Sequence, residues 1–197
     1  MMKRMICTLL CLCILFCFSS CAKNTVSDIL PTNAEVYEII IPDSLLNISG
    51  ISELEYIASF DNETHDVYTD VQLIDDEVIL YLTDTQRQNL INQVKDTIDI
   101  ILEDYYQCNT NYSFIGDDDY KSITFIYDEN ISESLETKVL GAVFAKYAYL
   151  NVLEHKDPNW KIHLQIYNCH TNKLVIEGDL EKERISWSQD DWARSYE

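Results

Sequence analysis

One stretch decides the fold of this chain: residues 67–86 are VYTDVQLIDDEVILYLTDTQ. Apolar and polar side chains alternate over residues 67–73, and a second extended run, Glu77–Leu82, follows. The pair Asp75-Asp76 separates the two runs, and a polar pair in this place is typical of a tight turn between antiparallel strands. The stretch therefore predicts a β-hairpin.

A long amphipathic helix is predicted directly after the hairpin. Thr83 and Gln86 have the spacing of a capping box, in which each side chain hydrogen-bonds the backbone amide of the other residue. Apolar residues then recur at helical spacing for about six turns, while polar residues fill the opposite face. The apolar positions are Leu90, Val94, Ile98, Ile101, Leu102 and Tyr105. We expect this stripe to pack against a core.

A second long helix is predicted to begin near Asn130 and Glu133, which can cap it, and to end near His155. Only Lys146 and Asn151 are strongly polar between residues 139 and 153. A helix that is apolar nearly all round is a buried one. We therefore expect this helix to be the most buried element of the fold.

Shorter elements complete the predicted fold. Strands are expected at Val36–Ile41, Lys121–Tyr127, Trp160–Tyr167 and Leu174–Leu180, and a short helix at Ser52–Phe60 with Leu54, Ile57 and Ala58 facing inward. The order of elements is then β-α-β-β-α-β-α-β-β. This order predicts a single α+β domain over residues 36–197, with a largely antiparallel sheet and two main helices.

The first residues are typical of an export signal. Lys3 and Arg4 precede the apolar run Met5–Phe18, which is too short to cross a membrane as a helix. The following Ser19, Ser20 and Cys21 complete a small-residue cleavage zone.

Phe18-Ser19-Ser20-Cys21 resembles the lipobox of bacterial lipoproteins, although Phe18 stands where those proteins usually have Leu. The resemblance implies that residues 1–20 are a removed signal peptide, that Cys21 is lipidated, and that residues 21–35 form a flexible tether. The chain would then be anchored at the extracytoplasmic face of the bacterial cell membrane. The alternative is ordinary signal-peptidase cleavage after Ala22, since Ser20 and Ala22 satisfy the small-x-small rule.

Other features are similar to those of small exported lipoproteins of uncharacterised function from low-GC Gram-positive bacteria. They are Ile41-Pro42 after the first strand, Val78–Leu82 leading into Thr83-Asp84-Thr85-Gln86, and the final hairpin over residues 161–178 with Thr171 in its turn. This resemblance implies no activity and no functional residues.

The charge of the chain is strongly and unevenly negative. Its formal net charge is −20, and no Lys or Arg occurs between Lys23 and Arg87, whereas fourteen acidic residues lie from Asp28 to Asp84. Nucleic-acid binding is excluded, because phosphate backbones require basic surfaces. A basic protein partner or cations would be attracted to this region; the alternative is that the charge serves solubility alone.

Cysteine and histidine offer few candidates for chemistry. Once the signal and Cys21 are set aside, only Cys108 and Cys169 remain, either as a disulfide bond or as two free thiols. His163, Cys169 and His170 form a metal-site candidate, because a hairpin brings strand and turn close together; the alternative is three exposed polar residues.

A run of three carboxylates at residues 116–119, Gly-Asp-Asp-Asp, fits a polar turn better than a calcium-binding loop.

No catalytic constellation, nucleophile motif or phosphate loop is present in the sequence, so we expect no catalytic residue and no cofactor. The aromatic residues Trp187, Trp192 and Tyr196 near the C-terminus form either a partner surface or a tail whose rings pack on the domain. The leading hypothesis is a lipid-anchored envelope protein with a non-catalytic binding or assembly role. The alternative hypothesis is a cell-envelope hydrolase or metal-dependent enzyme.

Overall fold

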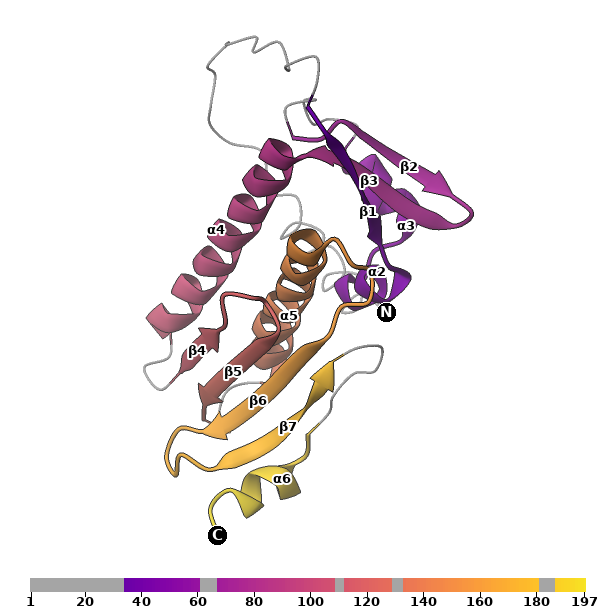
Figure 1. Cartoon of the computed structure of the whole chain (residues 1–197). Coiled ribbons are helices and arrows are strands. Elements are labelled where there is room, and N and C mark those ends of the chain that lie inside the picture. The colour runs from indigo at the N-terminus through magenta and orange to yellow at the C-terminus, as the bar shows by residue number, and fades with distance from the viewer. Residues whose placement is uncertain (1–33, 61–66, 109–111, 129–132, 181–186) are drawn as a thin grey trace. The chain divides into compact units, whose positions relative to one another are not determined.

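The computed structural model describes residues 34–60, 67–108, 112–128, 133–180 and 187–197, with side chains at all of these except 104–108 and 133–138 (Figure 1). The chain divides into two compact units, the first ending at Leu90 and the second spanning Ile91–Glu197. Each unit contains its own sheet. The predicted α+β class and the largely antiparallel strand pairing are confirmed.

The first unit is built on a three-stranded antiparallel sheet of order β1-β3-β2. Its strands are β1 (Val36–Ile41), β2 (Asp70–Ile74) and β3 (Glu77–Thr83). The hairpin between β2 and β3 is confirmed, and its two turn residues, Asp75 and Asp76, have φ angles of 52° and 66°. Two consecutive left-handed residues are the signature of the type I′ turn, whose twist matches that of paired strands.

Two short helices, α2 (Asp43–Ser49) and α3 (Glu53–Ala58), follow β1. The predicted inward face of α3 is wrong, because Leu54 is 68% exposed and Ala58 is exposed as well. Tyr56 is buried instead, and its ring lies edge-on to Phe60, with 5.3 Å between the centroids. The large aromatic rings one turn apart take the buried side of α3 because they bury more apolar surface than Leu54 does.

Helix α4 (Asp84–Cys108) begins in the first unit and continues into the second. Its predicted capping box is confirmed: the Thr83 amide donates to Oε1 of Gln86 at 2.8 Å, and the Gln86 amide donates to Oγ1 of Thr83 at 3.3 Å. Of the predicted stripe, Leu90, Val94, Ile98 and Leu102 are buried and Ile101 is half-buried, while the Tyr105 side chain lies outside the described ones.

The second unit has a four-stranded sheet of order β4-β5-β6-β7. Its strands are β4 (Ser113–Gly116), β5 (Ser122–Tyr127), β6 (Ile162–Asn168) and β7 (Leu174–Leu180). The outer pairs are antiparallel, but β5 and β6 run parallel. The parallel pair follows from the long helix α5 (Glu133–His155), which returns the chain to the starting end of the sheet between the two strands (Figure 1).

Helix α5 packs on this sheet, with Phe144 edge-on to Phe125 of β5 at a centroid distance of 5.3 Å. Most of its side chains from Val139 to Leu153 are buried, in the direction of the prediction, and Lys146 and Asn151 are buried with them at 4% exposure each. Asn151 donates a hydrogen bond to the carbonyl oxygen of Tyr120 at 2.8 Å. The predicted cap residue Asn130 lies outside the described residues.

The chain ends in a short helix, α6 (Gln189–Arg194), that the sequence did not predict. Ser188 and Asp191 form a capping box at its start. Trp192 is buried and lies edge-on to Tyr127, with 5.1 Å between the ring centroids. The sequence left two alternatives for the C-terminal aromatic residues, a partner surface or a tail packed on the domain. Trp192 agrees with the packed tail, while Tyr196 is 43% exposed. None of the helices in the described part of the chain is long and apolar enough to cross a bilayer.

Candidate functional site

The ends of β5 and β6 bring together three residues with metal-binding side chains. Asp128 directly follows β5, and Cys169 and His170 directly follow β6. The two strands are parallel and Tyr127 is in register with Asn168, so their carboxyl ends reach the same edge of the sheet. The Cys169 amide continues this pairing by donating to the Tyr127 carbonyl oxygen at 3.1 Å. In open α/β sheets the carboxyl ends of parallel strands are the usual place for ligand sites, and β5 and β6 share that strand direction.

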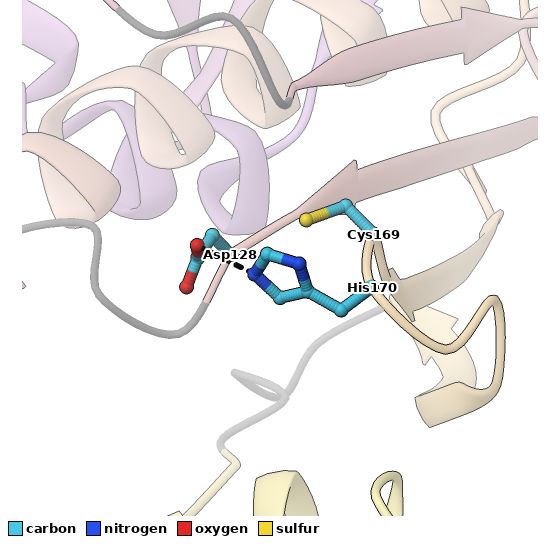
Figure 2. Close-up of side chains that lie close together, drawn as sticks. All are labelled: Asp128, Cys169 and His170. Atoms are coloured by element: carbon cyan, nitrogen blue, oxygen red, sulfur yellow. Dashed lines mark hydrogen bonds and ion pairs between the residues drawn. The ribbon is translucent and has the colours of Figure 1, made fainter.

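The three side chains form a compact cluster, shown in Figure 2. Nε2 of His170 lies 2.7 Å from Oδ2 of Asp128, which is a hydrogen bond and, when the imidazole is protonated, an ion pair. The candidate donor atoms of Asp128, Cys169 and His170 all lie within 4.8 Å of one another. The His170 side chain is 44% exposed and that of Asp128 is 20% exposed, so the cluster is open to solvent on one side.

Neighbouring residues hold His170 in place. Its backbone amide donates to Oδ1 of Asn168 at 2.8 Å, and its ring stacks on Tyr196 with 6.5 Å between centroids and 26° between planes. The fully buried Asn168 also donates to Oγ of Ser195 at 2.8 Å. The C-terminal segment thus fixes the turn that carries Cys169 and His170.

The electrostatics of Cys169 do not match those of a catalytic nucleophile. Burial raises the pKa of its thiol, and the nearby Asp128 carboxylate raises that pKa further. Reactive cysteines have a lowered pKa instead, because the thiolate is the attacking species. The cluster therefore combines a thiol of raised pKa with a hydrogen-bonded Asp–His pair.

His163, the third residue of the predicted metal candidate, lies at the opposite end of β6. Six residues of extended strand separate it from Cys169, which is about 20 Å. Its Nδ1 atom lies 3.0 Å from Oδ1 of Asp179 on the paired strand β7. The structure therefore brings Cys169 and His170 together but places His163 elsewhere, and Asp128 takes the third position.

Sequence reasoning missed Asp128, although a usable pattern was present. A strand, a long helix and a second strand in succession predict a parallel pair, and residues just after two parallel strands meet at one edge. Asp128 and Cys169-His170 occupy those positions. The predicted, largely antiparallel sheet would instead place the ends of consecutive strands at opposite edges.

A separate pocket of about 460 Å³ opens at the amino ends of β5 and β6. It is lined by Lys121, Asn151, His155, Asp157, Asn159, Lys161, His163 and Asp179. Lys161 and His163 hydrogen-bond Asp179 and hold the pKa of its carboxyl below the usual range. Nζ of Lys161 lies 2.8 Å from Oδ2 of that carboxyl. The charge of Lys161 is thus partly neutralised within the pocket.

The polar segment at residues 116–119 forms part of a turn. Oδ1 of Asp117 accepts hydrogen bonds from the Lys121 amide at 2.8 Å and from the Tyr147 hydroxyl at 3.0 Å, and that hydroxyl also donates to the Asp117 carbonyl oxygen at 2.5 Å. Nε2 of His155 contacts the Asp119 carbonyl oxygen at 2.8 Å. These bonds join the turn to helix α5, as expected for a structural turn.

The other predicted site residues are less fully described. Cys21 lies outside the described residues, as do the predicted export signal and most of the predicted tether. Cys169 is a free thiol in the structure, while the Cys108 side chain is outside the described set, so the disulfide stays a prediction. Comparison of the chain with protein-family models, with curated proteins and with solved structures gave no match.

Proposed function

We propose that this chain is a lipid-anchored extracytoplasmic protein with a non-catalytic binding or assembly role, and that its first unit binds a basic partner. The proposed location rests on the lipobox resemblance at Cys21, and the proposed role rests on the charge of the first unit. The exposed acidic side chains among the described residues support that role.

The observation that carries the binding role is an uncompensated negative surface. Nine acidic side chains are exposed in the described part of the first unit: Glu35, Glu38, Asp43, Glu55, Asp70, Asp75, Asp76, Glu77 and Asp84. The sequence supplies one basic residue to this unit after the tether, Arg87. The Arg87 side chain is only 9% exposed and pairs with Asp84 at 3.0 Å, so it contributes little positive potential at the surface.

Such a surface attracts cations over roughly one Debye length, about 10 Å at moderate ionic strength. A basic protein would therefore be steered to the first unit, and added salt would slow its association more than it would speed its dissociation. A surface that serves solubility alone would show no such partner.

The test is affinity capture from the native organism at low and at high salt, followed by association kinetics of the captured protein. The triple variant Asp75→Asn, Asp76→Asn, Glu77→Gln removes three charges, and asparagine suits the left-handed turn at least as well as aspartate does. We expect slower association for this variant. A matched control, Asp96→Asn, Asp99→Asn, Glu103→Gln, removes three exposed charges from α4 in the second unit and should leave the rate unchanged.

A partner captured equally well at low and high salt, and equally by both triple variants, would contradict the proposed role of the acidic surface.

The anchor has a separate test, because Cys21→Ala removes the thiol that receives the lipid. We expect this variant to leave the membrane fraction or to retain its signal, since two acyl chains are needed for stable anchoring. A variant that fractionates and migrates like the parent would contradict the lipoprotein assignment.

The second candidate function is a cell-envelope hydrolase or metal-dependent enzyme, and the pocket beside His163 favours it. Asp179 is placed to orient the His163 imidazole, as a carboxylate orients a general base. The discriminating assay is hydrolysis of ester and phosphoester model substrates by the parent and by His163→Gln. Hydrolysis by the parent that is absent in His163→Gln would favour this candidate function over the binding role.

A further inference from the structure

We propose that Asp128, Cys169 and His170 form a zinc site with three protein ligands and one open coordination position. This site lies in the second unit and does not depend on the acidic surface of the first. It replaces the sequence candidate that contained His163, because the parallel pairing of β5 and β6 supplies Asp128 instead.

The combination of donor atoms selects the metal. Imidazole nitrogen, thiolate sulfur and carboxylate oxygen together suit Zn²⁺, which binds all three types in tetrahedral sites. Ca²⁺ and Mg²⁺ take oxygen ligands almost alone, so a thiolate and an imidazole discriminate against them. Clusters of carboxylates alone, which are common on an acidic protein, lack this selectivity.

The geometry needs only small adjustments to bind the ion. Bond lengths of about 2.0–2.3 Å in a tetrahedron place donor atoms about 3.3–3.8 Å apart. The three candidate donors already lie within 4.8 Å of one another. The ion would replace the hydrogen bond between Nε2 of His170 and Oδ2 of Asp128. These two atoms are 2.7 Å apart and must separate slightly. Rotation of the partly exposed Asp128 and His170 side chains provides that movement.

The support around the cluster is of the kind that metal ligands need. The Asn168 side chain holds the His170 amide, the Tyr196 ring stacks on the imidazole, and the Cys169 amide is fixed to the Tyr127 carbonyl. These contacts fix the backbone at Cys169 and His170 and leave the His170 ring only small movements, so less conformational freedom is lost on binding. With three protein ligands the fourth position would hold water or an anionic ligand, as in open zinc sites.

The test uses the purified full chain, reduced and stripped of metal with a chelator, and titrated with Co²⁺ and then with Zn²⁺. Cobalt bound through a thiolate gives a sulfur-to-metal charge-transfer band in the near ultraviolet, and Zn²⁺ should displace it. We expect one equivalent to bind, Cys169→Ser to lose the band, and Asp128→Asn and His170→Gln to weaken binding at least tenfold. Zn²⁺ should also raise the Tm of the parent and not that of Cys169→Ser, because a ligand stabilises the state that binds it.

Two variants serve as matched controls. Cys108→Ser removes the other cysteine predicted to remain in the folded part, and His163→Gln removes the histidine at the far end of β6; both should keep the band and the affinity. Circular dichroism of every variant confirms that it is folded before titration. Absence of a thiolate band in the parent, or a band that survives Cys169→Ser, would overturn the proposal.

Discussion

The side chain of Asn168 is expected to be one of the most important polar groups in the second unit. It is fully buried at the end of β6 and makes two hydrogen bonds, donating to Oγ of Ser195 at 2.8 Å and accepting from the His170 amide at 2.8 Å. Asn168→Ala removes both bonds at once. The change tests whether the C-terminal segment is held to the sheet in the way that the structure indicates.

The expected loss of stability follows from the groups left behind. The His170 amide loses its acceptor, and an unsatisfied group of this kind costs about 1–3 kcal/mol. The Ser195 hydroxyl still donates to the Trp192 carbonyl oxygen at 2.6 Å, so its lost bond is worth about 0.5–1.5 kcal/mol. The total is about 1.5–4.5 kcal/mol.

Urea unfolding followed by tryptophan fluorescence measures this loss in the relevant unit, because Trp160, Trp187 and Trp192 are all in the second unit and are the only tryptophans of the chain. With a slope of about 2 kcal/mol per molar urea, the midpoint should fall by about 1–2 M. The control Asn92→Ala makes the same chemical change at an exposed position of α4 and should shift the midpoint little. Equal midpoints for Asn168→Ala and Asn92→Ala would refute the reasoning.

Three further variants test helix α5 and its contact with the sheet, and each is measured by the same unfolding curves. Val143→Asp places an unpaired charge at a fully buried position and should abolish cooperative unfolding; a cooperatively melting variant would show that this face is exposed. Gly141→Ala adds a methyl group with no atom within 4 Å and should stabilise the unit by about 0.5–1 kcal/mol, whereas destabilisation would indicate a hidden contact. Gly116→Ala would place its Cβ 2.6 Å from the Tyr147 hydroxyl, so it should destabilise by about 1–3 kcal/mol and by less in a Tyr147→Phe background; additive effects would contradict the close approach.

Local sequence patterns predicted the elements that depend on neighbours in the chain. The turn at Asp75-Asp76 and the capping box of Thr83 and Gln86 are set by residues one to three positions apart, so the sequence contains the whole interaction. The burial of α5 could also be predicted, because a helix without a polar face has no side to present to water. These features were correct for the physical reasons given.

Features that depend on which of several apolar side chains is buried were less predictable. In α3, Leu54 has the spacing of a core residue but is 68% exposed, because Tyr56 and Phe60 occupy the buried side. Helix α6 has no apolar periodicity to reveal it, and its position depends on Trp192 meeting Tyr127, which is distant in sequence. Periodicity shows which residues can be buried and does not rank them.

The sequence by itself determined the resemblance to an export signal, the negative charge of the first unit, and most of the strand, turn and helix signals, because each is a property of adjacent residues. Only the tertiary structure decided which strand ends meet. The return of the chain through α5 makes β5 and β6 parallel, and this pairing brings Asp128 to Cys169 and His170 across about forty residues of sequence while it keeps His163 at the other end of the same strand. A site made of residues from separate strands depends on strand direction, which no short stretch of sequence contains.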